Sequence, residues 1–414
     1  MADIKPFRAI RYDHIRTGGD VSNLIAPPYD VLDQADKDAL RAKSDRNVVV
    51  LDLPHIPPKS LGPQEAYDRS ARTLEAWLTD GTLVREERPA LYVYHQTFEH
   101  QGQSYTRRKL IARVRLQPFE EGVILPHERT FGGPKEDRLA LTKATASNLS
   151  PVFGLYTDPR DEIGAALAPT VAREPDVRGT LDGVVGRVWI LTDPAVIDRI
   201  VSTMSPKKLY IADGHHRYGT ALNYRDWVKE QNGGSLPEGH PANYVMLVLG
   251  SMDDPGSLIL PYNRALAGVN LATVVEAWAP GTEPAEPGDA DIVLFDGATG
   301  VEKGLRFTQR DKLRTLAPDE CPSWYKLDAA YLHRYLIDEL LRAKLKADPE
   351  VRYVKSDQDA RRMAKEERGV ALLVRATPMA HLRAVSEEGG LMPQKSTYFY
   401  PKLATGLTIN PLRE

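Results

Sequence analysis

The sequence has one cysteine, no long apolar run and almost no excess charge of either sign, and each shortage excludes a class of protein. Cys321 is the single cysteine in 414 residues, so no disulfide can form within the chain. Apolar runs such as Tyr244 to Leu249 are too short to span a bilayer. The net charge of −3 provides no global field for a polyanion. Since no leader-like series opens the chain at Met1, we expect a cytoplasmic protein that binds neither nucleic acid nor membrane.

Helical and strand patterns alternate along the chain. Residues 64–80 place apolar side chains at helical spacing and are followed by Gly81, as at the end of a helix. Residues 90–98 and 105–116 alternate apolar and polar positions around His100, Gln101 and Gly102, which predicts an antiparallel hairpin. No repeat period is visible. We therefore predict a mixed α/β or α+β fold without internal repeats.

The clearest change of composition is at residues 279–291, which are rich in proline, glycine and acids and have no apolar face. This stretch predicts a linker or a long surface loop. On that basis residues 1–278 form a main lobe and residues 292–414 a second lobe whose C-terminal segment returns to the site. Interlocked lobes forming one composite domain are the alternative.

The segment KKLYIADGHHRYGTAL, residues 207–222, predicts a buried strand, a tight turn and a helix. Unpaired N–H groups and the positive end of the macrodipole make such a helix start an anion site. Gly214 permits close approach of a ligand, and Arg217 offers a bidentate fork for phosphate. His215 and His216 point different ways, so one is expected to bind phosphate and the other to pack.

Plainer interpretations of this turn exist. Asp213 could merely cap the helix, with both histidines on the surface, or it could orient a histidine, bind Mg²⁺ or accept a proton from a hydroxyl. A zinc site is disfavoured because no further His or Cys pair stands at metal-ligand spacing. We favour the functional interpretation, because Asp-Gly-His-His-Arg after an apolar strand has no obvious folding purpose.

Two resemblances follow from these motifs. IADGHHRYGTAL resembles the DGHHR-type turn of the superfamily of ParB-type partition proteins, sulfiredoxin and the archaeal free-serine kinase. The resemblance implies a ParB/sulfiredoxin-like core that grips nucleotide phosphates. APPYDVL, LPHERTF, EDRL, NLSPVFGLY, IADGHHRY, LILPYNRAL and MPQKSTYFYPKLATGL together closely resemble a bacterial and archaeal family whose domain has no assigned function.

Further polar segments supply candidate site residues. The loop PHERTFGGPKEDRL mixes the carboxylates and cations that phosphoryl transfer requires, although it could also be a solvated loop with local ion pairs. Lys-Ser-Thr near the C-terminus lacks the glycine loop of a Walker A motif, and could equally belong to a docked terminal strand. Asn263 stands where family members often carry histidine. The candidates are Glu128, Asp213, His215 and His216 for catalysis; Gly214, His215, His216, Arg217, Arg129 and Arg138 for phosphate; His127, Thr130, Lys395, Ser396, Thr397, Arg264, Tyr29 and Asp30 for substrate; and Asp137 for Mg²⁺.

By resemblance to the free-serine kinase, the leading hypothesis is a kinase that transfers a phosphoryl group from ATP or ADP to a small hydroxylated metabolite, with L-serine as the first candidate. Mg²⁺ is the expected cofactor, Glu128 or Asp213 the expected base, and a homo-oligomer is left open. A phosphatase with water as acceptor is the alternative within enzymes. A ParB-like nucleotide-dependent binding switch is the alternative outside them, although no coiled coil or long basic tail supports it.

Overall fold

The computed structural model describes residues 1–58, 60–129 and 132–413, with the side chains of residues 132–134 also left out. The chain divides into two compact units. Unit 1 comprises Met1–Pro126, Thr130–Ser257 and Pro401–Glu414, and unit 2 comprises His127–Arg129 and Leu258–Tyr400. The boundary therefore falls at residue 257 rather than at the predicted residue 278, and each unit contains distant parts of the sequence.

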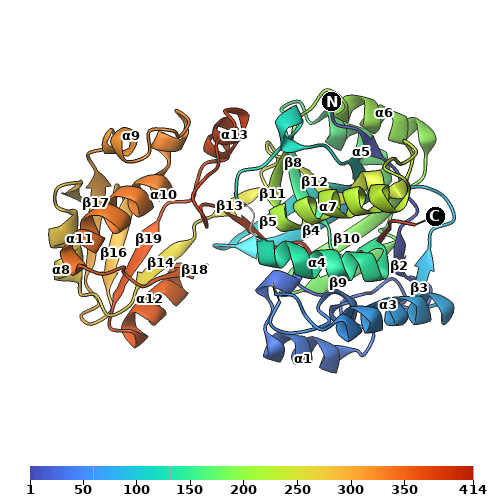
Figure 1. Cartoon of the computed structure of the whole chain (residues 1–414), viewed down its shortest axis with the longest axis horizontal. Coiled ribbons are helices and arrows are strands. Elements are labelled where there is room, and N and C mark those ends of the chain that lie inside the picture. The colour runs from blue at the N-terminus through green and yellow to red at the C-terminus, as the bar shows by residue number, and fades with distance from the viewer. Residues whose placement is uncertain (59, 130–131, 414) are drawn as a thin grey trace. The chain divides into compact units, whose positions relative to one another are not determined.

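Unit 1 is built on a large mixed sheet (Figure 1). Its strand order is β6-β11-β8-β12-β5-β4-β10-β9, with β1 paired to β5. The strands are β1 (Ile4–Lys5), β4 (Leu91–His100), β5 (Gln103–Arg115), β6 (Ile124–Leu125), β8 (Val152–Tyr156), β9 (Val177–Leu181), β10 (Val184–Leu191), β11 (Leu209–Asp213) and β12 (Tyr244–Ser251). Two small pairs accompany it, β2 (Ile10–Tyr12) with β3 (Leu83–Arg85) and β7 (Ser147–Asn148) with β21 (Asn410–Pro411).

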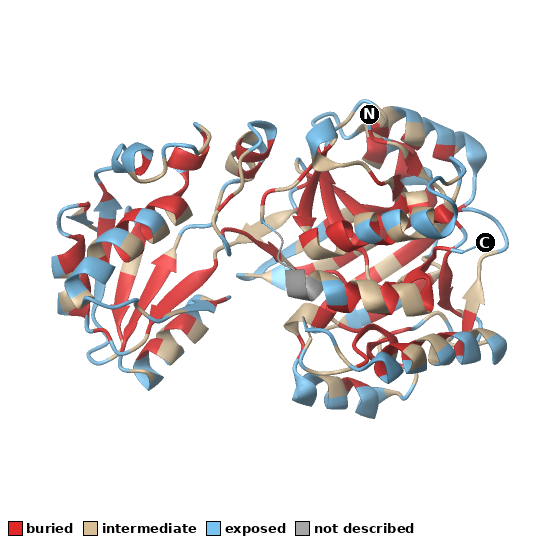
Figure 2. Ribbon diagram, in the orientation of Figure 1, coloured by how far each residue is buried: buried red, intermediate tan, exposed pale blue. Residues whose placement is uncertain are grey.

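The two faces of this sheet differ because successive side chains of a strand point to opposite sides. On β5, Leu110, Ala112 and Val114 belong to the apolar cluster that includes side chains of α5, α6 and α7. Arg107 and Lys109 alternate with them and face the other way. Figure 2 shows the sheet strands as the most continuously buried part of the unit. The helices are α1 (Gln34–Lys43), α2 (Val49–Asp52), α3 (Gln64–Thr79), α4 (Gly132–Thr145), α5 (Glu162–Val171), α6 (Pro194–Met204) and α7 (His215–Gln231).

Most local predictions for unit 1 are confirmed. The predicted helix at residues 64–80 is α3, and the predicted hairpin is β4 with β5, joined at Gln101 and Gly102, which both have positive φ. The strand, turn and helix predicted around Asp213 are β11, Gly214 and α7. The expected mixed α/β class is therefore observed.

Unit 2 has a six-stranded sheet in the described chain, in the order β15-β17-β16-β19-β14-β18. Its strands are β14 (Asn263–Leu266), β15 (Thr282–Ala285), β16 (Ile292–Asp296), β17 (Glu302–Phe307), β18 (Val351–Val354) and β19 (Val370–Val374), and β13 (Leu258–Leu260) pairs separately with β20 (Tyr398–Tyr400). The helices are α8 (Leu271–Trp278), α9 (Lys312–Leu316), α10 (Asp328–Ala330), α11 (Arg342–Leu345), α12 (Asp357–Glu366) and α13 (Met379–Glu387).

One feature of unit 2 differs from the predictions. Residues 279–291 are not a linker, because Thr282–Ala285 forms β15 and pairs with β17 inside the unit. Strand pairing uses backbone groups, so a stretch without an apolar face can still form an edge strand. Residues 328–345 form one helical stretch, and its middle, Tyr331–Leu341, is wound as a π-helix. Among the described residues, no helix combines the length and apolar character needed to cross a bilayer.

Candidate functional site

The turn after β11 presents the open start of a long helix. β11 ends at Asp213, and Gly214 follows with φ +91°, a conformation that favours glycine. The helix α7 then begins at His215, and no side chain caps its N-terminus. Since the first N–H groups of a helix point outward and carry the positive end of the macrodipole, this end of α7 favours an anion.

Asp213 is held between two cations. Its carboxylate is 2.8 Å from Lys402 Nζ and 3.5 Å from Arg217 Nη2, and its side chain is 21% exposed. Burial alone would raise the pKa of Asp213, but Lys402 and Arg217 hold that pKa well below its usual range. A carboxylate with so low a pKa is a weak proton acceptor. The geometry therefore favours Asp213 as an anchor for the two cations rather than as the predicted base.

Further cations lie on the adjacent face of β5. Arg107 is fully buried and donates to Gln96 Oε1 at 2.7 Å and to the main-chain oxygen of Pro401, while Gln96 Nε2 donates to the oxygen of Lys402 at 3.0 Å. Lys109 also donates to Gln96 Oε1. Burial and the neighbouring Arg107 lower the pKa of Lys109 well below its usual value. A bound anion would relieve this crowding of positive charge.

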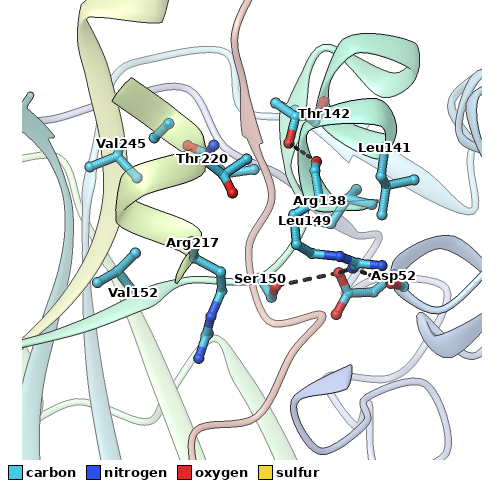
Figure 3. Close-up of a pocket in the computed structure, with 13 residues that line it drawn as sticks. Asp52, Arg138, Leu141, Thr142, Leu149, Ser150, Val152, Arg217, Thr220 and Val245 are labelled. Carbon is cyan, nitrogen blue, oxygen red and sulfur yellow. Dashed lines mark hydrogen bonds and ion pairs between the residues drawn. The ribbon is translucent and has the colours of Figure 1, made fainter. Parts of the chain in front are cut away.

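A small cavity of about 30 Å³ separates Arg217 from Arg138 of α4 (Figure 3). Arg138 is 4% exposed, donates to the main-chain oxygen of Asp52 at 2.6 Å and lies 3.4 Å from the carboxylate of Asp52. Ser150 donates to the same carboxylate at 3.3 Å. This volume is enough for about two water molecules, so the cavity is a gap within the charged cluster and not a substrate pocket.

Asp137 was predicted as a Mg²⁺ ligand, and its surroundings do not fit that role. It is fully buried, and its carboxylate oxygens accept from His55 at 2.7 Å, Tyr67 at 2.8 Å and Arg138 at 2.8 Å. A cation would have to displace all three donors. No cluster of three or more His, Cys, Asp or Glu side chains suited to a metal ion occurs in the described part of the chain.

Tyr29 and Asp30 lie in the same charged region. The guanidinium of Arg138 stacks on the ring of Tyr29 at 3.9 Å, and burial raises the pKa of Tyr29 to about 12. Asp33 caps the helix α1 by accepting from Asp36 N. Asp30 Oδ1 is buried and has no hydrogen-bond partner among the described residues.

The two adjacent histidines differ in exposure. His215 is 5% exposed, and it is among the groups that lower the pKa of Asp213. His216 is partly exposed, and its main-chain oxygen accepts from the hydroxyl of Thr220 at 2.8 Å. The expectation that one packs and one binds a ligand agrees with this difference in burial, and their ligand roles stay predictions.

A second group of predicted residues gathers within unit 2. His127 is 1% exposed, its Nε2 lies 3.0 Å from Thr397 Oγ1, and its main-chain oxygen accepts from Met392 N. Ser396 donates to the oxygen of Pro393 at 2.6 Å. The hydroxyls of Ser396 and Thr397 are therefore used within the chain, which indicates that they fix this segment. Lys395 has φ +56°, and its ammonium lies over the ring of Tyr262 at 5.2 Å.

Arg264 holds the carbonyl of Lys395 in place. It is 1% exposed, and its guanidinium donates to the oxygen of Lys395 at 3.2 Å, to the oxygen of Tyr262 and to His333 Nε2 at 3.1 Å. Glu128, half-buried, and Arg129, exposed, also belong to unit 2. Thr130 lies outside the described residues.

The predicted residues are divided between the two units. Unit 1 brings together Tyr29, Asp30, Arg138 and the Asp213–Arg217 turn, and unit 2 brings together His127, Arg264 and Lys395–Thr397. Sequence reasoning missed Arg107, Lys109 and Asp52, and it gave Lys402 no assigned role. One signal was available: Arg107 and Lys109 are two residues apart in a strand, so both point to one face.

Comparison with protein families matches residues 4–298 to the family described as "Protein of unknown function (DUF1015)". None of the curated proteins compared with the chain matches it. Solved structures with some likeness include free serine kinase in complex with AMP, with a TM-score of 0.34, 14% identity, 72% of this chain and 91% of that chain. Another is SbnI with a C-terminal truncation from Staphylococcus aureus. It has a TM-score of 0.38 and 12% identity, and the match covers 73% of this chain and 87% of that chain. A conserved hypothetical protein from Pyrococcus furiosus has a TM-score of 0.33 and 13% identity, and the match covers 72% of this chain and 95% of that chain.

Proposed function

The chain belongs to the DUF1015 family, and we propose from its own residues that it binds a nucleotide by its phosphates and transfers a phosphoryl group to a small hydroxylated metabolite. The observation that carries the proposal is the convergence of Arg217, Lys402 and Arg107 near the open N-terminus of α7. Asp213 is the acid paired with two of these cations. Buried cations beside a helix start suit the oxyanions of a phosphate chain.

In the proposed reaction, the hydroxyl oxygen of the acceptor attacks the terminal phosphorus of ATP or ADP. A new P–O bond forms, the bond to the departing nucleotide breaks, and the hydroxyl proton passes to a base. The cations would neutralise charge on the phosphoryl oxygens, as preorganised donors do in such sites. Glu128 stays the predicted base and L-serine the first acceptor to test.

Asp213 would keep Arg217 and Lys402 oriented before the nucleotide binds. When a phosphate arrives, these cations can contact it without leaving Asp213, because guanidinium and ammonium groups have several N–H donors. This predicts that the exact shape of the guanidinium matters at position 217. Lysine there keeps the charge but cannot form the fork.

The test compares Arg217→Lys with Arg225→Lys, a conservative change further along the same helix. We expect Arg217→Lys to weaken ATP or ADP binding by about tenfold or more, since one lost charge-assisted bond is worth roughly 1.5–3 kcal/mol. Arg225→Lys should bind as the parent does, because Arg225 contacts Asp226 and the main chain at Leu116. Equal affinities for Arg217→Lys and the parent in calorimetry would contradict the proposed phosphate site.

Phosphorus NMR then separates the reaction types. A new phosphoester signal with ATP or ADP and a panel of hydroxylated amino acids supports the kinase, and free phosphate alone indicates hydrolysis. Binding without turnover indicates a nucleotide-dependent switch. Glu128→Gln should abolish the phosphoester while leaving nucleotide affinity unchanged, and a fully active Glu128→Gln variant would remove Glu128 from the mechanism.

A further inference from the structure

Gln96 is a buried side chain of β4 that lies beside the cations of β5 and has no role in the proposed reaction. It is 2% exposed and stands opposite Arg107 in the register of β4 with β5. Directly paired residues of neighbouring strands project to the same face of a sheet. On its other side Gln96 is paired with Gly186 of β10, which has no side chain to fill this space. The fold therefore leaves Gln96 room beside Arg107.

Both polar atoms of this side chain have partners in the charged region of unit 1. Oε1 accepts from Arg107 Nη2 at 2.7 Å and from Lys109 Nζ, and Nε2 donates to the main-chain oxygen of Lys402 at 3.0 Å. Arg107 also donates to the main-chain oxygen of Pro401. The amide of Gln96 thus ties two basic side chains of β5 to residues 401–402, which belong to the same unit.

Residues 401–402 bring a cation to the turn after β11. Lys402 Nζ lies 2.8 Å from the carboxylate of Asp213, the last residue of β11. The carbonyl of Lys402 is the group to which Gln96 donates. Because the lysine side chain is a flexible four-carbon stem, the place of its ammonium depends on how firmly its main chain is held. Gln96 therefore acts on the ammonium of Lys402 through the backbone.

We infer that Gln96 is a positioning residue for phosphate, which orients Arg107 and holds Lys402 so that both cations are in place before the anion binds. The inference rests on the proposed function, because the anion is the phosphate chain that the proposal gives to Arg217, Lys402 and Arg107. Donors that are fixed in advance need no reorganisation when the charge arrives.

An amide suits this task better than a carboxylate does. The amide oxygen carries no net charge, so it orients Arg107 without cancelling the positive charge. Burial lowers the pKa of Arg107 to about 10, so its guanidinium stays charged at neutral pH. The amide nitrogen donates to the carbonyl of Lys402, which an ionised carboxylate cannot do. Glutamate at position 96 would therefore fill the same space but lose both functions.

Calorimetry of the full chain with potassium pyrophosphate tests the inference, because this probe carries phosphate groups without a nucleoside or an acceptor. Gln96→Glu should weaken pyrophosphate binding by about tenfold or more, since one added negative charge opposes the anion in a poorly solvated site. Gln96→Met keeps the length of the side chain, removes its amide and should weaken binding by about threefold or more. Gln103→Glu is the matched control, because Gln103 is exposed on the same hairpin and should bind as the parent does.

Combined variants separate positioning from packing. Gln96→Met should weaken pyrophosphate binding less in a Lys402→Met background than in the parent, because the cation that Gln96 positions is already absent. A role in packing alone would give the same fold-change in both backgrounds. Circular dichroism shows whether each variant is folded. The isosteric Gln96→Glu variant keeps the test usable if Gln96→Met folds poorly.

The outcomes distinguish this inference from the proposed reaction. Binding of pyrophosphate by Gln96→Glu as tightly as by the parent, or equal fold-changes in the two backgrounds, would overturn the inference alone. A parent that binds no pyrophosphate would also overturn it, whereas titrations with ATP and ADP would still decide the proposed function. Absence of any phosphoester, with pyrophosphate binding that depends on Gln96, would count against the proposed transfer alone.

Discussion

Arg138 in unit 1 and Arg264 in unit 2 are both buried, but their positive charges have different partners. Arg138 is 4% exposed and lies against the carboxylates of Asp52 and Asp137. Arg264 is 1% exposed and donates to two main-chain oxygens and to His333. No carboxylate of the described chain lies within ion-pair distance of Arg264.

Opposite pKa shifts follow from this difference. Burial would lower the pKa of Arg138, but Asp52 and the neighbouring acids raise it above its ordinary value. Burial lowers the pKa of Arg264 to about 10, because only Tyr353 opposes the effect. Arg138 is held by the negative charge of the adjacent carboxylates, whereas Arg264 is held by hydrogen bonds to neutral acceptors. The two arginines should therefore respond differently to the same kind of substitution.

The largest effect is expected for Arg138→Leu. Its removal leaves the buried carboxylates of Asp52 and Asp137 without their cation, and such a loss typically costs about 3–5 kcal/mol. Urea unfolding of the variant measures this change in the free energy of unfolding. Arg72→Leu is the control, because Arg72 forms an exposed pair with Glu65 and should cost less than about 1 kcal/mol. Similar losses for both variants would contradict the importance of the buried acids.

Low pH should destabilise unit 2 through His333. Burial and the adjacent Arg264 lower the pKa of His333 to about 3, below the usual value near 6.5. The unfolded chain therefore binds a proton at a higher pH than the folded chain does. Stability is complete above about pH 6.5 and decreases by up to about 1.4 kcal/mol per unit as pH falls from there toward 3.

The substitution His333→Gln isolates this contribution, because every other titrating group is shared with the parent. We expect the free energy of unfolding to depend less steeply on pH between 6.5 and 4.5 in the variant. The measurement is chemical unfolding at several pH values. Identical slopes for the two proteins would mean that His333 is protonated in the folded state.

A smaller effect is expected for Arg264→Met, which keeps the apolar stem and removes an uncompensated charge. The lost hydrogen bonds to the carbonyls of Lys395 and Tyr262 cost about 1–2 kcal/mol, partly offset by the desolvation energy that the cation no longer requires. Urea unfolding should therefore show a loss well below that of Arg138→Leu. An equal loss would mean that Arg264 has an anionic partner, which would remove the contrast between the units.

The sequence predicted the local helices, strands and turns better than it predicted how the chain divides into two units. Periodicity and glycine identified α3, the β4–β5 hairpin and the β11–α7 turn, because these depend on neighbouring residues. The edge strand β15 was missed, since its stability comes from pairing with β17 and not from its own apolar pattern. Residues 401–414 belong to unit 1; a return of the C-terminal segment to the site was expected, but no local pattern marks the residue at which it begins.

The sequence predicted only those residues of the candidate site that are neighbours in the chain. Gly214 and Arg217 were recognised because they adjoin in sequence at a helix start. Asp52 and Arg107 were missed, since they reach the charged region through tertiary packing from distant segments. The ionised, paired state of Asp213 depends on Lys402, which is 189 residues away, so its weakness as a base could not be inferred from the motif alone.

The smallest effect on stability is expected for Gly214→Ala, which changes geometry around Arg217 without changing any charge. The φ of +91° strains any other residue, at a cost of roughly 1 kcal/mol. The new Cβ would lie 2.9 Å from Arg217 Nε, so the guanidinium must shift. Gly102→Ala is the matched control, because Gly102 has φ +75° and open space where a Cβ would stand. Similar stability losses with weaker nucleotide binding only in Gly214→Ala would show that unit 1 requires the position of Arg217 as well as its charge. Equal nucleotide affinities would show that charge alone suffices.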